Sequence, residues 1–200
     1  MSFERSNRRL LDARDRREEI LRRQLRRRSP ATLFLSLNIP GRRKIRAGAA
    51  ALFRWTQAEL RRTFFPLRTL VSGRDSLGPY AVLQVGGNSR VAPGPGDPGC
   101  RSHPGRSQGG PGRRLGKAPE AKRLCARIEA ARPAARLVDL DVYDARGVRI
   151  GRTSLGLPAR RCLACARPAA ECMRLKRHEP EEIVQIADEL LADFRDCAPR

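Results

Sequence analysis

The stretch RLVDLDVYD, residues 136–144, decides the fold of this chain, because its apolar and polar side chains alternate. Successive side chains of a β-strand point to opposite faces, so one set is predicted to face a core: Val138, Leu140 and Val142. Asp139 and Asp141 then share the other face, roughly 7 Å apart, where two carboxylates can hold Mg²⁺. Such a pair suits phosphoryl or nucleotidyl transfer. A merely polar outer face gives the same spacing and is the commoner explanation.

The elements around this strand predict an α+β fold, with a mixed or antiparallel sheet and flanking helices. Helices are predicted where apolar residues recur at helical spacing: residues 4–28, residues 45–64, and a last helix starting near Pro180. Strands are predicted where apolar and polar residues alternate: residues 32–39, 80–85, 122–129 and 148–155. Glu129 would lie on the polar side of the strand that precedes the acidic pair. It is therefore a candidate third magnesium ligand.

Residues 86–117 are rich in glycine, proline and arginine and hold almost no large apolar side chain. Such a segment cannot bury enough surface to offset the entropy lost on ordering. We predict a disordered basic loop, inserted into a single domain of residues 1–200. Anion binding by this loop, and a stretch translated in the wrong frame, are the alternatives.

The chain has 42 basic and 21 acidic residues, a formal net charge of +21, so it should attract polyanions. Aromatic residues make up only 4%, which argues against a protein that stacks single-stranded nucleic acid. A GC-rich coding sequence that adds arginine to a solvated surface is an equally good explanation of the charge. No secretory signal and no membrane-spanning segment is visible in the sequence, so we expect a cytoplasmic protein with no membrane partner.

Three cysteines and a histidine gather in RRCLACARPAAECMRLKRH, residues 160–178, and are candidate ligands of a metal ion: Cys162, Cys165, Cys172 and His178. Three interpretations are open. Sulfur and nitrogen ligands suit zinc. Reduced cysteines of a cytosolic protein can also simply pack or form hydrogen bonds. A redox role is the third, although the βαβ setting of a thioredoxin-like motif is not visible. With or without metal, Arg160 and Arg161 would form a rim that binds phosphate.

Taken together, these motifs resemble one family, the apo-citrate lyase phosphoribosyl-dephospho-CoA transferases. The resemblance is most specific from Arg136 to His178, through the acidic strand and the R-x-C-L-x-C segment. It extends to three further stretches: LLDARDRREEILRRQL (10–25), NIPGRRK (38–44) and APEAKRLCARIEAARP (118–133). In all it covers roughly residues 8–85 and 118–195. Residues 86–116 have no counterpart in the family, and Ala135 stands where glycine is usual.

The resemblance implies a nucleotidyltransferase-like enzyme that uses Mg²⁺. It would move the 2'-(5''-phosphoribosyl)-3'-dephospho-CoA group from its triphosphate donor to a serine of the citrate lyase acyl-carrier subunit, with release of pyrophosphate. Asp139 and Asp141 would be the catalytic metal ligands. Phosphates would be bound by a set of basic residues: Arg136, Lys44, Arg14, Arg17, Arg160 and Arg161. For Arg14 and Arg17, solvation of the first helix is an equal alternative.

Two other functions remain open from the sequence. One is a zinc-stabilised basic module that binds nucleic acid, which the few aromatic residues disfavour. The other is an inactive homologue whose only role is to bind the carrier protein.

Overall fold

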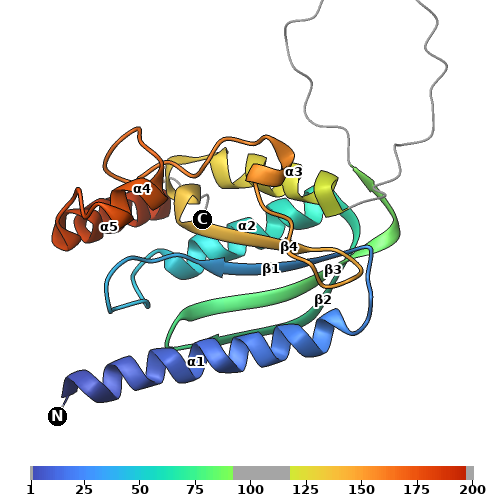
Figure 1. Ribbon diagram of the computed structural model, residues 1–200, viewed down its shortest axis with the longest axis horizontal. Helices are drawn as coiled ribbons and strands as arrows, with labels where there is room; N and C mark the ends of the chain where they lie inside the picture. The colour runs from blue at the N-terminus through green and yellow to red at the C-terminus, as the bar shows by residue number, and fades with distance from the viewer. Residues whose placement is uncertain (1, 92–117, 197–200) are drawn as a thin grey trace, which may run out of the picture.

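A four-stranded antiparallel sheet with helices on both faces forms the protein, in a computed structural model that describes residues 2–91 and 118–196 of the chain (Figure 1). The strand order is β2-β3-β1-β4. The elements, in chain order, are α1 (Ser2–Leu25), β1 (Ala31–Leu37), α2 (Ala49–Thr63), β2 (Phe64–Asp75), β3 (Gly78–Val91), α3 (Ala118–Ala130), η1 (Pro133–Leu137), β4 (Val138–Tyr143), η2 (Thr153–Leu155), α4 (Ala169–Arg174) and α5 (Pro180–Asp196).

The central strand β1 pairs with β3 on one side and with β4 on the other, both antiparallel. Its residues Leu33 and Leu35 are completely buried in one core with the apolar faces of α2, α3 and α5. Helix α1 lies across the opposite face of the sheet (Figure 1). The predicted α+β class is therefore confirmed, and the sheet is antiparallel throughout.

The alternation predicted for the acidic strand is present in β4. Its three apolar residues are completely buried: Val138, Leu140 and Val142. Asp139 and Asp141 are half-buried and share the other face, the one on which α1 lies. Because β4 is an edge strand, one side of its backbone faces away from the sheet and needs hydrogen-bond partners from elsewhere.

The prediction of a strand over residues 122–129 is wrong, because these residues form the helix α3. The alternation in KRLCARIE suggested a strand, but the residues that are buried recur at helical spacing: Ala118, Ala121, Cys125 and Ile128. Alanine, arginine, lysine and glutamate, which dominate this stretch, are also strong helix formers. Glu129 consequently lies near the end of a helix and is buried.

The prediction of a strand over residues 148–155 is also wrong. Only one β-bridge forms there, between Tyr143 and Arg149, and the Ile150 N–H donates to Val142 O at 2.8 Å. The chain then leaves the sheet and turns into the short helix η2.

The hairpin of β2 and β3 is longer than the sequence indicated. Strand β2 was not predicted, because it is an edge strand with mostly half-exposed residues, two irregularities in register and a proline, Pro66. Strand β3 extends beyond the predicted residues 80–85, and residues 86–91 of the predicted loop belong to it. The rest of that loop, residues 92–117, lies outside the described residues. Helix α4 was not predicted either.

Helix α2 begins at Ala49, four residues later than predicted, because Gly48 has a left-handed backbone with φ of 82°. A Cβ at this position would lie 2.4 Å from the carbonyl oxygen of Leu191. Glycine is therefore required here for the close approach of α5. In the described part of the chain, no helix has the length and apolar character needed to cross a membrane.

A buried ion pair fastens α1 to the β2–β3 hairpin. Arg17 is 7% exposed, and its Nε and Nη2 donate to the Asp75 carboxylate at 2.8 and 2.6 Å. Nη2 also donates to Gly78 O at 2.7 Å, and the guanidinium lies over the ring of Tyr80, 4.7 Å from its centroid. Arg17 therefore does not solvate the helix, which was one of its two predicted roles.

We expect Arg17→Ala to lower the free energy of unfolding by about 3–5 kcal/mol, because Asp75 would be left as a buried charge without its partner. Urea unfolding followed by circular dichroism measures the change. Arg14, exposed on the same helix, supplies the control, and Arg14→Ala should change stability by less than about 0.5 kcal/mol. Equal effects of the two substitutions would contradict a structural role for Arg17.

Candidate functional site

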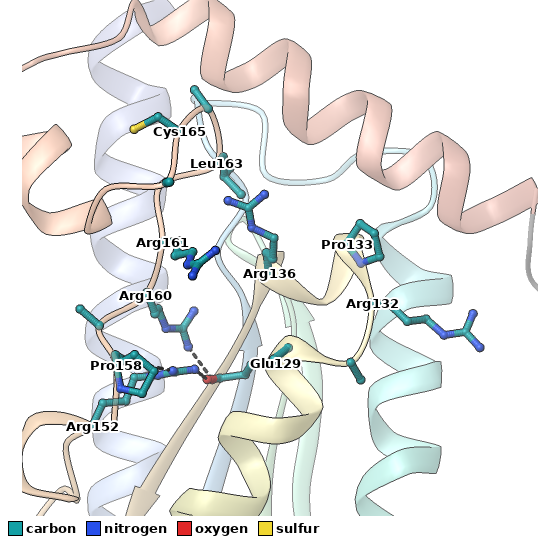
Figure 2. A pocket seen from close by; sticks show the side chains of 15 residues that line it. Glu129, Arg132, Pro133, Arg136, Arg152, Pro158, Arg160, Arg161, Leu163 and Cys165 are labelled. Carbon is teal, nitrogen blue, oxygen red and sulfur yellow. Dashed lines mark hydrogen bonds and ion pairs between the residues drawn. The ribbon is translucent and has the colours of Figure 1, made fainter. Parts of the chain in front are cut away.

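A cavity of ≈ 810 Å³ opens between the end of α3 with η1 and the loop of residues 158–166 (Figure 2). Five arginines and one glutamate provide its polar lining: Arg132, Arg136, Arg152, Arg160, Arg161 and Glu129. Small apolar side chains, Pro133 and Leu163 among them, make up most of the rest. An apolar cleft with converging cations fits a ligand that combines an organic body with several negative charges.

Glu129 holds two of the arginines that line this cavity. Its side chain is 3% exposed, and both of its oxygens are engaged. Oε1 accepts from the Leu140 N–H of the edge strand β4 at 2.9 Å and from Arg160, while Oε2 accepts from Arg152. Two turns earlier on α3, Lys122 donates to Leu140 O at 2.6 Å. The helix therefore satisfies the outward-facing backbone of β4, and Glu129 also holds two arginines at the cavity wall (Figure 2).

Arg160 connects the cavity to the acidic strand. The same Nη2 that contacts Glu129 donates to Asp139 Oδ1 at 2.7 Å, and Nη1 donates to Val138 O at 2.9 Å. Among the described residues that line the cavity, neither aspartate of the pair is present. Arg160 is thus the side chain through which the cavity and the acidic pair meet.

Of the two aspartates of β4, Asp141 is harder to ionise than a free aspartate. The side chain of Asp139 is 38% exposed and that of Asp141 is 24% exposed. Burial raises the pKa of Asp141, and the negative charge of Asp139 raises it further, against the opposing effects of Arg149 and Lys122. Arg149 lies 3.3 Å from Asp141. Two hard carboxylates with unfavourable mutual charge are a donor set that a divalent cation would stabilise.

The remaining arginines of the cavity are held in different ways. Arg136 donates to the carbonyl oxygen of Cys162, and Arg161 lies on the loop that forms the cavity's other wall. Arg132 points away from these two, toward α2, and its guanidinium lies 5.5 Å from the ring centroid of Trp55 (Figure 2). Arg132 and Arg152 were missed in the sequence. Arg152 was missed because residues 148–155 were predicted to be a strand, whereas in the structure a turn brings Arg152 to Glu129.

None of the predicted phosphate ligands of the N-terminal half lines the cavity: Arg17 and the backbone of Lys44 lie at the turn of the β2–β3 hairpin, and Arg14 is exposed on α1. Lys44 donates to Ile39 O at 2.6 Å, and burial, with the charge of Arg46, lowers the pKa of Lys44. Its carbonyl oxygen lies beside Gly78, the residue that Arg17 also contacts. The register places Tyr80, which lies under Arg17, in one row with Ser36 and Asp139. The backbone of Tyr80 is therefore about two strand spacings, roughly 10 Å, from that of Asp139 across the sheet.

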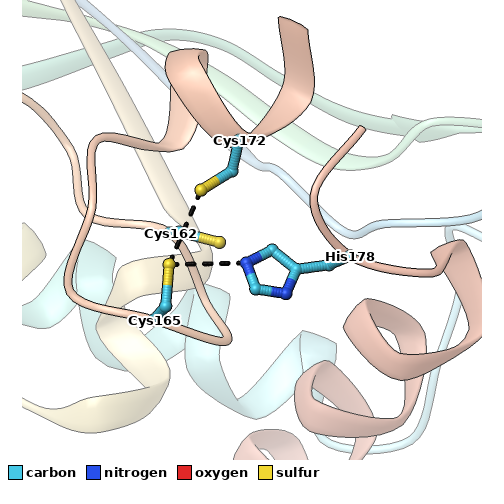
Figure 3. A group of neighbouring side chains, drawn as sticks. All are labelled: Cys162, Cys165, Cys172 and His178. Carbon is cyan, nitrogen blue, oxygen red and sulfur yellow. Dashed lines mark hydrogen bonds between the residues drawn. The ribbon is translucent and has the colours of Figure 1, made fainter. Parts of the chain in front are cut away.

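The four predicted soft ligands meet in one place (Figure 3): Cys162, Cys165, Cys172 and His178. Their ligand atoms all lie within 4.8 Å of one another, and all four cysteines in the described part of the chain are free thiols. Burial raises the pKa of Cys162, but hydrogen bonds from the Ala164 and Cys165 N–H groups to its sulfur make the net shift downward. Burial, together with the hydrogen bonds and the charge of Cys165 and Cys162, raises the pKa of Cys172 to about 11. The cluster could hold a metal ion.

Known proteins match the part of the chain that contains the cavity and the cysteine cluster. Residues 115–194 match the family model described as apo-citrate lyase phosphoribosyl-dephospho-CoA transferase. A relative from Vibrio cholerae serotype O1 (strain M66-2), named a probable member of that family, is 42% identical over 77 residues, covering 38% of this chain and 43% of the relative. A relative from Escherichia coli O9:H4 (strain HS) with the same family name is 37% identical over 70 residues, covering 35% of this chain and 38% of the relative.

These matches confirm the family resemblance over residues 115–194, which contain the cavity lining, the acidic pair and the cysteine cluster. The chain spans less than half the length of the curated relatives it matches. The resemblance over residues 8–85 lies outside the family match and stays a prediction.

Proposed function

We propose that this chain is a nucleotidyl-type transferase that attaches 2'-(5''-phosphoribosyl)-3'-dephospho-CoA to the acyl-carrier subunit of citrate lyase. The observation that carries the proposal is the double contact of Arg160, which joins the cation-lined cavity to Asp139. A triphosphate donor needs several cations beside an acidic pair, and this arrangement supplies both in one place.

In the proposed reaction, a serine Oγ of the carrier attacks the phosphorus of the donor that is bonded to ribose. The new phosphodiester bond forms as the bond to pyrophosphate breaks, and the serine proton passes to a carboxylate of the acidic pair. Arg136, Arg160 and Arg161 bind the phosphate oxygens, where negative charge accumulates as pyrophosphate leaves. The apolar lining beside them accommodates the organic part of the donor.

Asp139 and Asp141 would hold Mg²⁺, which supplies positive charge to the phosphate oxygens when it is bound. Their donor set fits, because both carboxylates are partly exposed on one face of β4. Burial raises the pKa of Asp141, and the negative charge of Asp139 raises it further, a repulsion that a cation would relieve. Glu129 is less suited to be a third ligand, since Arg152, Arg160 and a backbone N–H already occupy its oxygens. We assign Glu129 to positioning the arginines instead.

The N-terminal basic residues have a second place in the proposal. Arg14, which is exposed on α1, and Lys44 lie on elements that meet at the β2–β3 turn and are candidates for donor phosphates. Arg17 stays a candidate only through its place on α1, because its donors already serve Asp75 and Gly78. A nucleotidyltransferase-like fold and a cytosolic location, which reduced cysteines would require, also belong to the proposal.

The net charge of +21 would favour encounter with an acidic carrier protein. Incubating purified chain with the carrier subunit, the triphosphate donor and Mg²⁺ tests the function. We expect the carrier to gain the mass of the prosthetic group, and pyrophosphate to appear in equal amount. The E. coli relative is the positive control. Carrier binding without mass gain, while that relative modifies the same carrier, would indicate an inactive homologue and overturn the proposal.

A further inference from the structure

We infer that the cysteine cluster is a closed, four-coordinate zinc site, and that a fifth residue orients its histidine. This goes beyond the proposed transfer reaction, which does not use the cluster. The four ligands are Cys162, Cys165, Cys172 and His178, and the orienting residue is Glu182.

Two separations between the ligand atoms match a tetrahedron around zinc, and all of the ligand atoms lie within 4.8 Å of one another. Bonds of about 2.3 Å to sulfur and about 2.0 Å to nitrogen place ligand atoms roughly 3.5–3.8 Å apart. Cys165 Sγ lies 3.5 Å from Cys172 Sγ and 3.4 Å from His178 Nε2. All four side chains point to one centre in Figure 3. Three sulfurs and one nitrogen are soft ligands, which zinc accepts and which Mg²⁺ and Ca²⁺ avoid.

The backbone holds the first pair of ligands in a tight turn. The Cys162 N–H donates to Arg167 O, and the Ala169 N–H donates to Arg160 O, each at 2.8 Å, so residues 160–169 form a small hairpin. An isolated β-bridge between Arg161 and Pro168 closes the same hairpin, which carries Cys165 at its tip.

A second turn brings the other two ligands back to the first pair. The Cys172 carbonyl accepts from the Arg177 N–H at 3.1 Å. Lys176 between them has a left-handed φ of 47°, a conformation uncommon for a residue with a side chain. This bend closes the chain after α4 and places His178 against the cysteines.

Glu182 supplies the outer contact that a zinc-bound histidine needs. It lies one turn beyond His178 in the sequence, and its Oε2 is 3.5 Å from His178 Nδ1. A carboxylate at Nδ1 leaves Nε2 free to bind metal and fixes the orientation of the ring. The nitrogen that faces Cys165 is Nε2.

Zinc bound by the cluster would affect the loop that lines the cavity. Arg160 and Arg161 immediately precede Cys162, the carbonyl oxygen of Cys162 accepts from Arg136, and Cys165 itself lines the cavity. Zinc would therefore fix the loop that presents these arginines, although it would touch no substrate.

The test measures metal and not activity, so it stands or fails separately from the proposed function. The chain of residues 1–200, purified under reducing conditions, should contain about one zinc per chain by elemental mass spectrometry. Cys165→Ser should lose it. Cys125→Ala removes a buried thiol that belongs to α3 and lies outside the cluster, and it should keep the zinc.

Glu182→Gln should weaken zinc binding about 10- to 100-fold in competition with a chromophoric chelator. Glu181→Gln, on the exposed neighbouring residue, should leave the affinity unchanged. If Cys165→Ser fails to fold, Co²⁺ is added to the metal-free wild-type chain instead. A tetrahedral site with thiolate ligands should then show the thiolate-to-cobalt absorption band. No band, no zinc uptake by the wild type, or a Cys165–Cys172 disulfide in the reduced preparation would overturn the inference.

Discussion

Replacing Asp141 with asparagine is expected to abolish transfer to the carrier and to make the folded chain more stable at neutral pH. The loss of activity should be on the order of 100-fold or more, because the metal's charge stabilisation of the transition state is worth several kcal/mol. Asparagine keeps the shape of the side chain but cannot provide the negative charge that holds Mg²⁺. Mass spectrometry of the carrier over time measures the rate.

The gain in stability follows from the pKa of Asp141, which burial and the charge of Asp139 raise above the ordinary value of 3.8. The folded chain therefore holds this proton at a pH where the unfolded chain has lost it. The stabilising contribution of the protonated side chain is complete below the unfolded value and is lost as pH rises through the folded pKa. Asparagine mimics the protonated form and keeps that contribution at neutral pH.

Urea unfolding of both proteins at pH 7 and near pH 3, in chelator to remove divalent cations, measures this effect. The advantage of Asp141→Asn should be present at pH 7 and should shrink near pH 3. Asp15→Asn, on the exposed surface of α1, is the matched control and should change neither stability nor activity. A variant that keeps its activity, or that is less stable than the wild type at pH 7, would remove the basis for a metal-holding pair.

Glu129→Ala should be the most destabilising single substitution near the cavity, with a loss of about 3–5 kcal/mol. It would leave Arg152 and Arg160 without their shared carboxylate and the Leu140 N–H of β4 without an acceptor. Glu129→Gln should recover part of the loss, because the amide oxygen can still accept from Leu140. Urea unfolding curves for the two variants and the wild type give the comparison.

Glu59 is the matched control for this substitution. Its carboxylate pairs with Arg62 one turn away on the more exposed surface of α2, where ion pairs contribute little. Glu59→Ala should therefore cost less than about 1 kcal/mol. Similar losses for Glu59→Ala and Glu129→Ala would show that Glu129 does not organise the arginines of the cavity.

Much of the fold was predictable where one element repeats a clear pattern. The alternation of β1 and β4 and the helical spacing of α2 and α5 were strong enough to identify these elements. The stretch KRLCARIE fits both periods, and the sequence could not show which of its faces would be buried. Strand β2 was hidden for the opposite reason, since an edge strand that is largely exposed carries little apolar alternation.

The residues of the candidate site were also predictable only in part. The spacing of cysteines and histidine in the sequence identified the group that the structure brings together. Arg132 and Arg152 could not be recognised, because nothing separates a cavity arginine from the many others in this chain until the loop of residues 158–166 is placed. Glu129 was singled out as a metal ligand on a strand, and the structure places it on the helix α3, where it contacts two arginines.

By itself, the sequence determined that Asp139 and Asp141 share one face, because the two-residue period of an extended strand is a property of the local backbone. Only the tertiary structure decided that Glu129 binds two arginines that lie 23 and 31 residues further along the chain. Such contacts depend on how α3 and the cavity loop pack against the edge of the sheet, and that packing is set by the whole core. The placement of the acidic pair on one face thus follows from the local sequence, whereas its contact with Arg160 at the cavity depends on the tertiary fold.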